Sequence, residues 1–350
     1  MTPPPTWVRR LFIDPLIVVG VVLAAFSLPV WILVALFVSR LVPGRWRIFR
    51  IAWFLFLYLA VEALALMGLF LLWVGSGFGW KIRSKSFRSA HYWLFGWALR
   101  RVVRSAKFTF KLSLLVEGPI ATTAGEVGRR PALIFGRHAG PGDSMLLMDA
   151  LANGYHRDLR IVLKEFLQWD PMVDVMLNRL PTAFVPGGRK GGEALIAAIG
   201  ELAGGMSMDD AFVIFPEGAN YTERRHRRAI QKLRETGRPD LAERAEQLRR
   251  TLPPRSKGVM TVLASAPSDS DVFFVGHAGL ETFVTAGDIW RGMPMDTSVA
   301  VRIWHVRAEE IPPPDGQEEW LYDMWAEIDE WIHSSLSETG ELVFDDPDAY

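Results

Sequence analysis

The chain of 350 residues is long enough for one sizeable α/β domain and a membrane module, and half of its residues are hydrophobic. Its mean hydropathy of +0.15 is high for a purely soluble protein. The absence of cysteine excludes disulfides, thiolate nucleophiles and cysteine-ligated metals, and a formal net charge of zero conceals a basic body and an acidic C-terminal end.

Two apolar segments come first in the chain. Leu16–Val38 contains 23 residues without a charge, and Ile51–Val74 contains 24 residues with one charge, Glu62. As a helix the first segment is ~34 Å long, which is enough to cross the hydrocarbon core of a bilayer and too long for a cleaved signal peptide. We therefore expect residues 1–80 to form a two-helix hairpin that anchors the protein in a membrane.

Basic residues flank this hairpin. Arg9 and Arg10 precede it, arginines fill its short connection, and nine Lys or Arg without an acid follow between Lys81 and Lys111. Because positive charge lies on both sides of each apolar segment, the positive-inside rule does not distinguish a hairpin that spans the membrane from a monotopic one that enters and leaves the same leaflet. In either case we expect the following domain on the cytoplasmic side, with its basic first segment facing anionic lipids rather than nucleic acid.

The C-terminal end is acidic. No Lys or Arg follows Arg307, whereas 14 Asp and Glu do. The rest of the chain therefore holds all 39 basic residues against 39 − 14 = 25 acidic ones. The last segment, residues 337–350, is expected to be a disordered acidic tail.

From about Phe108, short apolar or β-branched runs alternate with amphipathic stretches. This pattern predicts an α/β fold for residues 81–336, with a mostly parallel or mixed sheet covered by helices. The expected strands are Phe110–Val116, Ala132–Phe135, Asp158–Lys164, Thr182–Val185, Ala211–Phe215, Val272–Gly276 and Val299–Trp304. The expected helices are Ser144–Asn153, Glu165–Asn178, Lys190–Ala203, a helical hairpin over Tyr221–Leu252 and a packed helix over Gln317–Leu336.

The strand Ala132–Phe135 leads into a loop that contains His138 and Asp143. Ligands gather beyond the carboxyl ends of strands in open α/β sheets, and the small residues between His138 and Asp143 let the carboxylate turn back to the imidazole. A carboxylate on one ring nitrogen fixes the tautomer and makes the other nitrogen a better base. His138 and Asp143 are therefore candidate catalytic residues. The alternative is a helix-capping Asp beside an incidental His.

A second strand-end loop carries Pro216-Glu217-Gly218. Glu217 is suited to accept hydrogen bonds from an acceptor hydroxyl or from neighbouring backbone amides. The remaining six histidines show no recurring partner pattern and are expected to be structural or surface residues, although His277 follows a strand and is placed to reach the site. The candidates to receive a phosphate are Arg224 and Arg225, or Arg189 and Lys190, and the fork geometry of arginine is especially suited to this role.

The combination of these loops resembles a known family. His138-x4-Asp143, followed 77 positions after the His by Phe215-Pro216-Glu217-Gly218, is similar to the lysophospholipid or 1-acylglycerol-3-phosphate acyltransferases. Leu180–Val185 with Arg189 stands where that family has an acceptor-binding arginine segment. The segment around Lys257, Pro254-Arg255-Ser256-Lys257-Gly258, and the regions Val299–Ile311 and Trp320–Trp325 resemble the branch that acts on lysophosphatidate and related lipids. The chain differs at Arg137, where Asn is usual, and at Ala219-Asn220, where Thr-Arg is usual.

The resemblance implies transfer of a fatty acyl group from acyl-CoA or acyl carrier protein to a lysophospholipid, with 1-acylglycerol-3-phosphate as the expected acceptor. His138 would deprotonate the acceptor hydroxyl and Asp143 would orient His138. Backbone amides near Gly140–Gly142 or at Gly218 would hold the oxyanion. Because a thioester is already activated, no acyl-enzyme, metal or cofactor is expected. The residues expected to serve the acceptor or its phosphate are Glu217, Gly218, Arg189, Arg224, Arg225 and Lys257.

Three alternatives are open. The first is an acceptor with another headgroup: lysophosphatidylglycerol, lysophosphatidylinositol or a glycolipid. A hydrolase would use water as the acceptor, but the sequence has no Gly-x-Ser-x-Gly elbow and no His-Glu-x-x-His zinc motif. A non-catalytic membrane adaptor would leave His138, Asp143 and Glu217 without a use.

Overall fold

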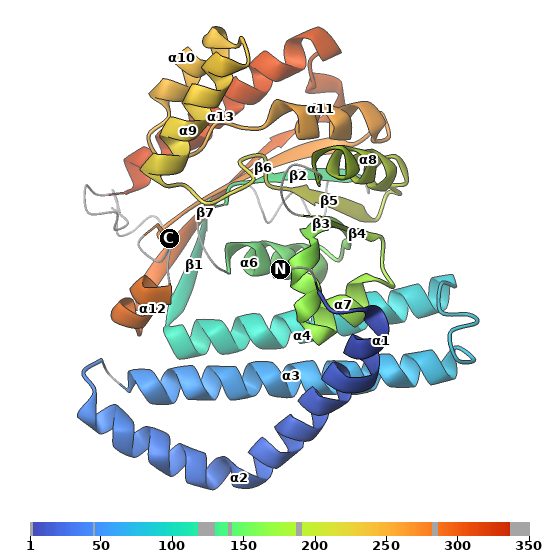
Figure 1. Cartoon of the computed structure of the whole chain (residues 1–350). Coiled ribbons are helices and arrows are strands. Elements are labelled where there is room, and N and C mark those ends of the chain that lie inside the picture. The colour runs from blue at the N-terminus through green and yellow to red at the C-terminus, as the bar shows by residue number, and fades with distance from the viewer. Residues whose placement is uncertain are drawn as a thin grey trace. The chain divides into compact units, whose positions relative to one another are not determined.

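The computed structural model describes residues 3–44, 46–117, 130–138, 142–186, 191–281 and 286–336. Its strands form a seven-stranded mixed sheet in the order β1-β7-β6-β2-β5-β3-β4 (Figure 1). The strands are β1 Leu112–Glu117, β2 Ala132–Gly136, β3 Asp158–Lys164, β4 Thr182–Val185, β5 Asp210–Ile214, β6 Asp271–Ala278 and β7 Thr297–Val306. β2 pairs in parallel with β5 and β6, β3 in parallel with β4, and β6 antiparallel with β7. The predicted mixed sheet covered by helices is confirmed.

The helices complete the fold. The longer ones are α2 Asp14–Leu41, α3 Arg47–Gly75, α4 Lys85–Phe110, α8 Gly191–Gly204, α9 Glu223–Glu235, α10 Pro239–Gln247, α11 Ser256–Ser265 and α13 Gln317–Ser335. The shorter ones are α1 Thr6–Val8, α6 Asp143–Asp149, α7 Pro171–Leu177 and α12 Ala286–Gly292. Single turns of π or 3-10 helix are η1 Arg9–Ile13, η2 Ala150–Gly154, η3 Glu165–Trp169, η4 Ala308–Glu310 and η5 Pro314–Gly316.

Two sequence predictions were wrong in detail. The first strand begins at Leu112 rather than at Phe110, because α4 continues to Phe110 and Lys111 ends it in the left-handed conformation, at φ 55°. The stretch from Glu165 is not one helix. It breaks at Asp170, whose side chain accepts a hydrogen bond from the Val173 N–H at 2.8 Å and so caps α7.

The chain divides into two compact units, which are described separately. The first consists of residues 1–112, 145–198 and 290–296, and the second of residues 113–144, 199–289 and 297–350. The domain boundaries expected from the sequence after residues 80 and 336 stay predictions, and residues 337–350 lie outside the part of the chain that the structure describes.

In the first unit, the helices Thr6–Leu41 and Arg47–Gly75 are long and apolar enough to cross a membrane. α2 packs against α3, and α3 packs against α4. Pro29 lies inside α2, which bends in Figure 1, as expected when a proline removes a helical hydrogen bond. These two helices can form the hairpin expected from the sequence. Its mode of insertion and its orientation stay predictions.

The basic segment after the hairpin folds into α4, a helix that the sequence analysis did not predict. Leu94, Ala98 and Val102 recur at a spacing of four residues and are buried, whereas Arg101 and Arg104 are exposed. The segment is therefore an amphipathic helix whose apolar face packs inside the unit. Contact of its basic face with lipid headgroups stays a prediction.

In the second unit, the core lies on the central strands. Phe135 of β2, Phe212 of β5 and Phe274 of β6 are fully buried, and the rings of Phe135 and Phe274 meet edge to face at 5.4 Å. α13 packs against β6 and buries Leu321, Trp325, Ile328 and Ile332 completely. The predicted packed helix over Gln317–Leu336 is thus confirmed.

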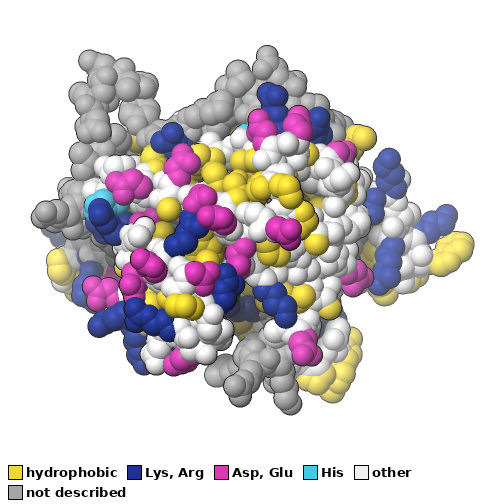
Figure 2. Space-filling view, turned by 90° about the horizontal axis from the view of Figure 1, so that it is seen from above, with side chains coloured by type: hydrophobic (Ala, Val, Ile, Leu, Met, Phe, Trp, Pro, Cys, Tyr) yellow, Lys and Arg dark blue, Asp and Glu magenta, His cyan; other side chains and the backbone are white. Residues whose placement is uncertain are grey.

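The predicted helical hairpin over Tyr221–Leu252 is also confirmed, as α9 and α10. Arg238 forms an ion pair with Glu318 at 2.8 Å, and Arg244 pairs with Asp323 of α13. Figure 2 shows Lys and Arg interspersed with Asp and Glu over the face that these helices line. Part of the acidic excess near the C-terminus is therefore neutralised by basic residues of the helical hairpin.

Candidate active site

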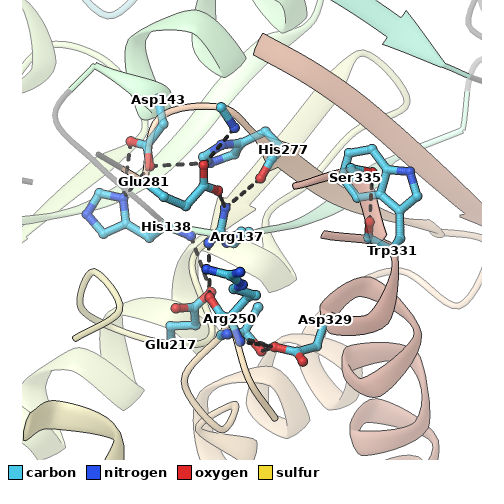
Figure 3. A network of polar contacts seen from close by, with 12 residues as sticks. Arg137, His138, Asp143, Glu217, Arg250, His277, Glu281, Asp329, Trp331 and Ser335 are labelled. Carbon is cyan, nitrogen blue, oxygen red and sulfur yellow. Dashed lines mark hydrogen bonds and ion pairs between the residues drawn. The ribbon is translucent and has the colours of Figure 1, made fainter. Parts of the chain in front are cut away.

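His138 and Asp143 lie side by side just beyond the end of β2 (Figure 3). Nδ1 of His138 is 3.0 Å from Oδ2 and 3.1 Å from Oδ1 of Asp143. Because an ionised carboxylate only accepts hydrogen bonds, Nδ1 carries the proton and donates, which leaves Nε2 of His138 with a free electron pair. The His138 side chain is 28% exposed, so the ring is accessible to a substrate.

Asp143 is the buried member of this pair, with a side chain that is 2% exposed. Gly142 before it adopts φ +100°, a conformation that favours glycine and turns the chain into α6. Burial acts to raise the pKa of Asp143, but the hydrogen bond from His138 and the neighbouring imidazole of His277 hold it well below its ordinary value. The N–H of Ser144 also donates to Oδ1 at 2.5 Å. Asp143 is therefore ionised at neutral pH.

His277 comes from the neighbouring strand. Gly136 of β2 is paired with Val275 of β6, so His138 and His277 each follow this pair by two residues. Nε2 of His277 lies 3.5 Å from Oδ2 of Asp143 (Figure 3). The carboxylate of Asp143 thus lies between two imidazoles. His277 is the one of the six histidines other than His138 that the sequence analysis expects near the site, and in the structure it lies beside Asp143.

Glu217 follows β5 and is 1% exposed. Its Oε1 accepts a hydrogen bond from the His138 N–H at 3.4 Å, and its Oε2 accepts one from the Leu252 N–H at 3.3 Å. Burial raises the pKa of Glu217 to about 8, although the charge of Arg137 and the two N–H groups act in the opposite direction. The carboxyl group therefore holds backbone amides beside the site. Direct contact of Glu217 with an acceptor stays a prediction.

Gly218 forms the tight turn after Glu217, at φ +66°. Its N–H donates to the Phe215 carbonyl at 3.0 Å, so this amide is used within the turn. The expectation that backbone amides near Gly218 hold an oxyanion stays a prediction. Of the other expected donors, Gly142 is described, and Gly140 lies outside the described residues.

The arrangement of a histidine, a buried carboxylate and a second strand-end turn can be compared with known proteins. The acyltransferase family model matches residues 116–276, a span that includes His138, Asp143 and Glu217 and ends one residue before His277. This segment is an acyltransferase domain. The family is the one of the lysophospholipid and 1-acylglycerol-3-phosphate acyltransferases, so the resemblance seen in the sequence is confirmed. No curated protein matched the chain.

Within the acyltransferase domain, Arg137 is a buried arginine, 1% exposed, directly before the histidine. Its Nη1 donates to the His277 carbonyl at 2.5 Å and forms an ion pair with Glu281, and its Nη2 donates to the Arg250 carbonyl at 2.9 Å. Burial of a guanidinium is tolerated only with such partners. Arg137 thus ties the end of β2 to the end of β6 and to the loop at residue 250.

A carboxylate outside the matched span supports the acyltransferase domain from α13. Asp329 is 3% exposed and accepts hydrogen bonds from the N–H groups of Arg249, Arg250 and Thr251, at 2.8, 2.8 and 2.7 Å, and from Oγ1 of Thr251 at 2.8 Å. The next residue, Leu252, donates to Glu217. Asp329 therefore fixes the loop that holds Glu217. This role could not be predicted from the sequence, because about 80 residues separate the partners.

One arginine that was not among the sequence candidates lies on the Glu217-Gly218 turn. A Cβ at position 218 would be 2.7 Å from Cζ of Arg255, so the Arg255 guanidinium covers this glycine. The N–H of Arg255 donates to the Pro216 carbonyl at 2.9 Å, and the side chain is exposed. The signal in the sequence was the segment from Pro254 to Gly258, from which Lys257 was selected instead.

The remaining candidates are basic residues away from this turn. Arg224 and Arg225 lie exposed in the first turn of α9, where Nη1 of Arg225 donates to the Asn220 carbonyl at 3.0 Å. Lys257 is exposed in the first turn of α11. Arg189 lies outside the described residues. The roles of these four residues in binding a phosphate stay predictions.

Proposed function

We propose that this acyltransferase moves a fatty acyl group from a thioester carrier, acyl-CoA or acyl carrier protein, to the free hydroxyl of a lysophospholipid. The first candidate acceptor is 1-acylglycerol-3-phosphate, which would give phosphatidate. The observation that carries the proposal is the His138 imidazole, held through Nδ1 by the buried Asp143 carboxylate at 3.0 Å within an acyltransferase domain.

In the proposed reaction, Nε2 of His138 takes the proton of the acceptor hydroxyl as its oxygen attacks the thioester carbonyl. The carbon–sulfur bond then breaks, and the departing sulfur takes the proton back from the imidazolium. Asp143 keeps Nδ1 protonated and stabilises the positive charge on the ring. A general base accelerates such a reaction ~10²–10⁴-fold. Holding both substrates in the reactive geometry lowers the activation free energy by ~7–11 kcal/mol. No acyl-enzyme is formed, because the acceptor hydroxyl attacks the thioester directly and no protein nucleophile takes part.

The acceptor phosphate is assigned to Arg255 in this proposal. Its guanidinium is exposed and lies on Gly218, next to the residue that holds the His138 backbone. Asn220 occupies the position where related sequences usually carry an arginine, and Arg255 reaches the same turn from the start of α11. An arginine fork can bind a phosphate through two parallel hydrogen bonds.

The lipid acceptor also explains the apolar helices of the first unit. Thr6–Leu41 and Arg47–Gly75 would hold the enzyme at the membrane, where a lysophospholipid is found. The proposal places the catalytic domain on the cytoplasmic side, where it would meet a soluble thioester carrier.

The test uses the purified full-length protein in mixed micelles. The protein is incubated with labelled acyl-CoA or acyl carrier protein and a panel of lysophospholipids, and the labelled product is identified. We expect labelled phosphatidate from 1-acylglycerol-3-phosphate, little product from Asp143→Asn, and a normal yield from His156→Asn, a change at an exposed histidine. Labelled free fatty acid without a lipid product would indicate a hydrolase. No transfer to any acceptor would contradict the proposal and favour an adaptor.

A further inference from the structure

The proposed reaction uses one histidine, but the Asp143 carboxylate is shared by two. His277 is a residue of β6 with a side chain that is 9% exposed, and its Nε2 lies 3.5 Å from the same Oδ2 that contacts His138 (Figure 3). Among the described residues, neither ring nitrogen of His277 has a hydrogen-bond partner of good geometry. A buried imidazole that lies beside the carboxylate of the proposed catalytic pair requires an explanation.

The fold fixes the position of His277 independently of its side-chain contacts. Successive residues of a strand point to opposite faces, so Gly276 faces away from the site. A Cβ at Gly276 would lie 3.0 Å from Trp304 and 3.2 Å from Trp331, which shows how closely the other face of β6 is covered. β6 therefore has little room to move, and His277 is held on the face that carries Asp143.

The backbone of His277 is also anchored. Its carbonyl accepts a hydrogen bond from the buried Arg137 at 2.5 Å. The charged groups that face His277 are Asp143 of α6, Arg137 beside β2 and Glu281 after β6, whose pKa is lowered by Arg137 and His277 against the effect of burial. On the other side of Asp143 lies His138, and the β7 residue opposite His277 is the uncharged Val301.

We propose that His277 is a positioning residue for acyl transfer, which holds the Asp143 carboxylate from the side opposite His138. This inference rests on the proposed function. A donor on Nε2 of His277 stops the carboxylate from rotating, so that both lone-pair directions of Oδ2 stay occupied and His138 keeps its tautomer.

The test compares His277→Gln, whose amide nitrogen can replace Nε2 as a donor, with His277→Phe, which cannot donate. For His277→Phe we expect kcat to fall at least fivefold, the KM values of both substrates to change less than twofold, and the acid limb of the kcat–pH profile to shift. His277→Gln should recover at least half of the lost kcat. Circular dichroism and gel filtration of each variant show whether it is folded.

A purely structural role predicts that both variants lose activity only in proportion to their folded fraction, with an unchanged pH profile, and that result would overturn the proposal. Wild-type kcat in His277→Phe would overturn it as well. A metal ion held by His138, Asp143 and His277 is a further outcome that contradicts it, shown by loss of activity with a chelator and recovery with Zn²⁺. Among the described residues, no group of three His, Asp or Glu has the geometry to hold a metal ion.

Failure of the proposed function can be told apart from failure of this inference. If the wild-type protein transfers no acyl group, the proposed function is wrong. The coupling of the two histidines is then measured by NMR on protein with ¹⁵N-labelled histidine. A change in the His138 tautomer or titration in His277→Phe, but not in His277→Gln, supports the inference. Identical His138 signals in all three proteins overturn it.

Discussion

The backbone N–H of His138 donates a hydrogen bond to the buried carboxyl group of Glu217 at 3.4 Å, across 79 positions of sequence. The two residues follow the parallel strands β2 and β5, which pair directly. This bond joins the His-x4-Asp loop and the Phe-Pro-Glu-Gly turn into one site. It also gives a physical reason for their occurrence together, because the second motif holds the backbone of His138, the residue proposed as the base.

Glu217→Gln should change the pH dependence of stability. Burial raises the pKa of Glu217 from 4.5 to about 8, so its contribution to stability is fully present below about pH 4.5 and is lost as the pH rises toward 8. Gln imitates the protonated acid and does not titrate. The free energy of unfolding in urea, measured in one detergent from pH 5 to pH 8, should therefore fall less steeply in the variant.

The control for this series is Glu193→Gln, at an exposed glutamate of α8. The free energy of unfolding of this variant should fall with pH as steeply as that of the wild type. Parallel curves for Glu217→Gln and the wild type would show that Glu217 has an ordinary pKa. Asp143 does not affect this comparison. Its pKa is lowered in the folded protein, so its contribution to the free energy of unfolding is lost only in acid, below pH 5.

Asp329→Ala should weaken both stability and turnover, although α13 contributes no residue to the chemistry. The change leaves three backbone N–H groups and a hydroxyl without their acceptor. We expect a loss of ~2–5 kcal/mol in the free energy of unfolding, and a lower kcat in the folded fraction, because the loop that donates to Glu217 becomes mobile.

Asp323→Ala on the same helix is the matched control. Asp323 pairs with Arg244 at the surface and is 64% exposed, so its removal should cost less than ~1 kcal/mol. Urea unfolding and kcat are measured for both variants. Equal effects of the two changes would show that Asp329 does not organise the site.

Arg255→Gln should weaken binding of a phosphate-bearing acceptor. We expect KM for 1-acylglycerol-3-phosphate to rise about 10-fold, since a hydrogen bond to a charged group contributes ~1.5–3 kcal/mol, with a smaller change in kcat. Arg228→Gln, at an exposed arginine of α9, should leave KM unchanged. A raised KM for the acyl donor alone would instead assign Arg255 to the phosphates of the carrier.

Local features of this protein could be predicted from its sequence. Asp158–Lys164 and Thr182–Val185 were predicted with the bounds that the structure shows, because each is a short apolar run between breaks in the pattern. His138 and Asp143 could be paired because they are five positions apart in one loop of small residues. The apolar helices were evident from length and composition alone.

Features that depend on distant parts of the chain could not be predicted in the same way. Asp329 reaches the site only because α13 packs against β6, and Arg255 reaches Gly218 only through the turn at Pro216. The position of His277 depends on the register of β2 and β6, which no single strand reveals. α4 was missed because the nine basic residues between Lys81 and Lys111 conceal the apolar face of the helix.

The central claim is that His138, supported by Asp143, is the base for acyl transfer to a lysophospholipid. It is tested most directly by comparing His138→Ala with the wild type for transfer of labelled acyl groups to 1-acylglycerol-3-phosphate in mixed micelles. We expect the variant to stay folded and membrane-bound but to transfer acyl groups at least ~10²-fold more slowly than the wild type. Transfer at a near-normal rate by folded His138→Ala would contradict it.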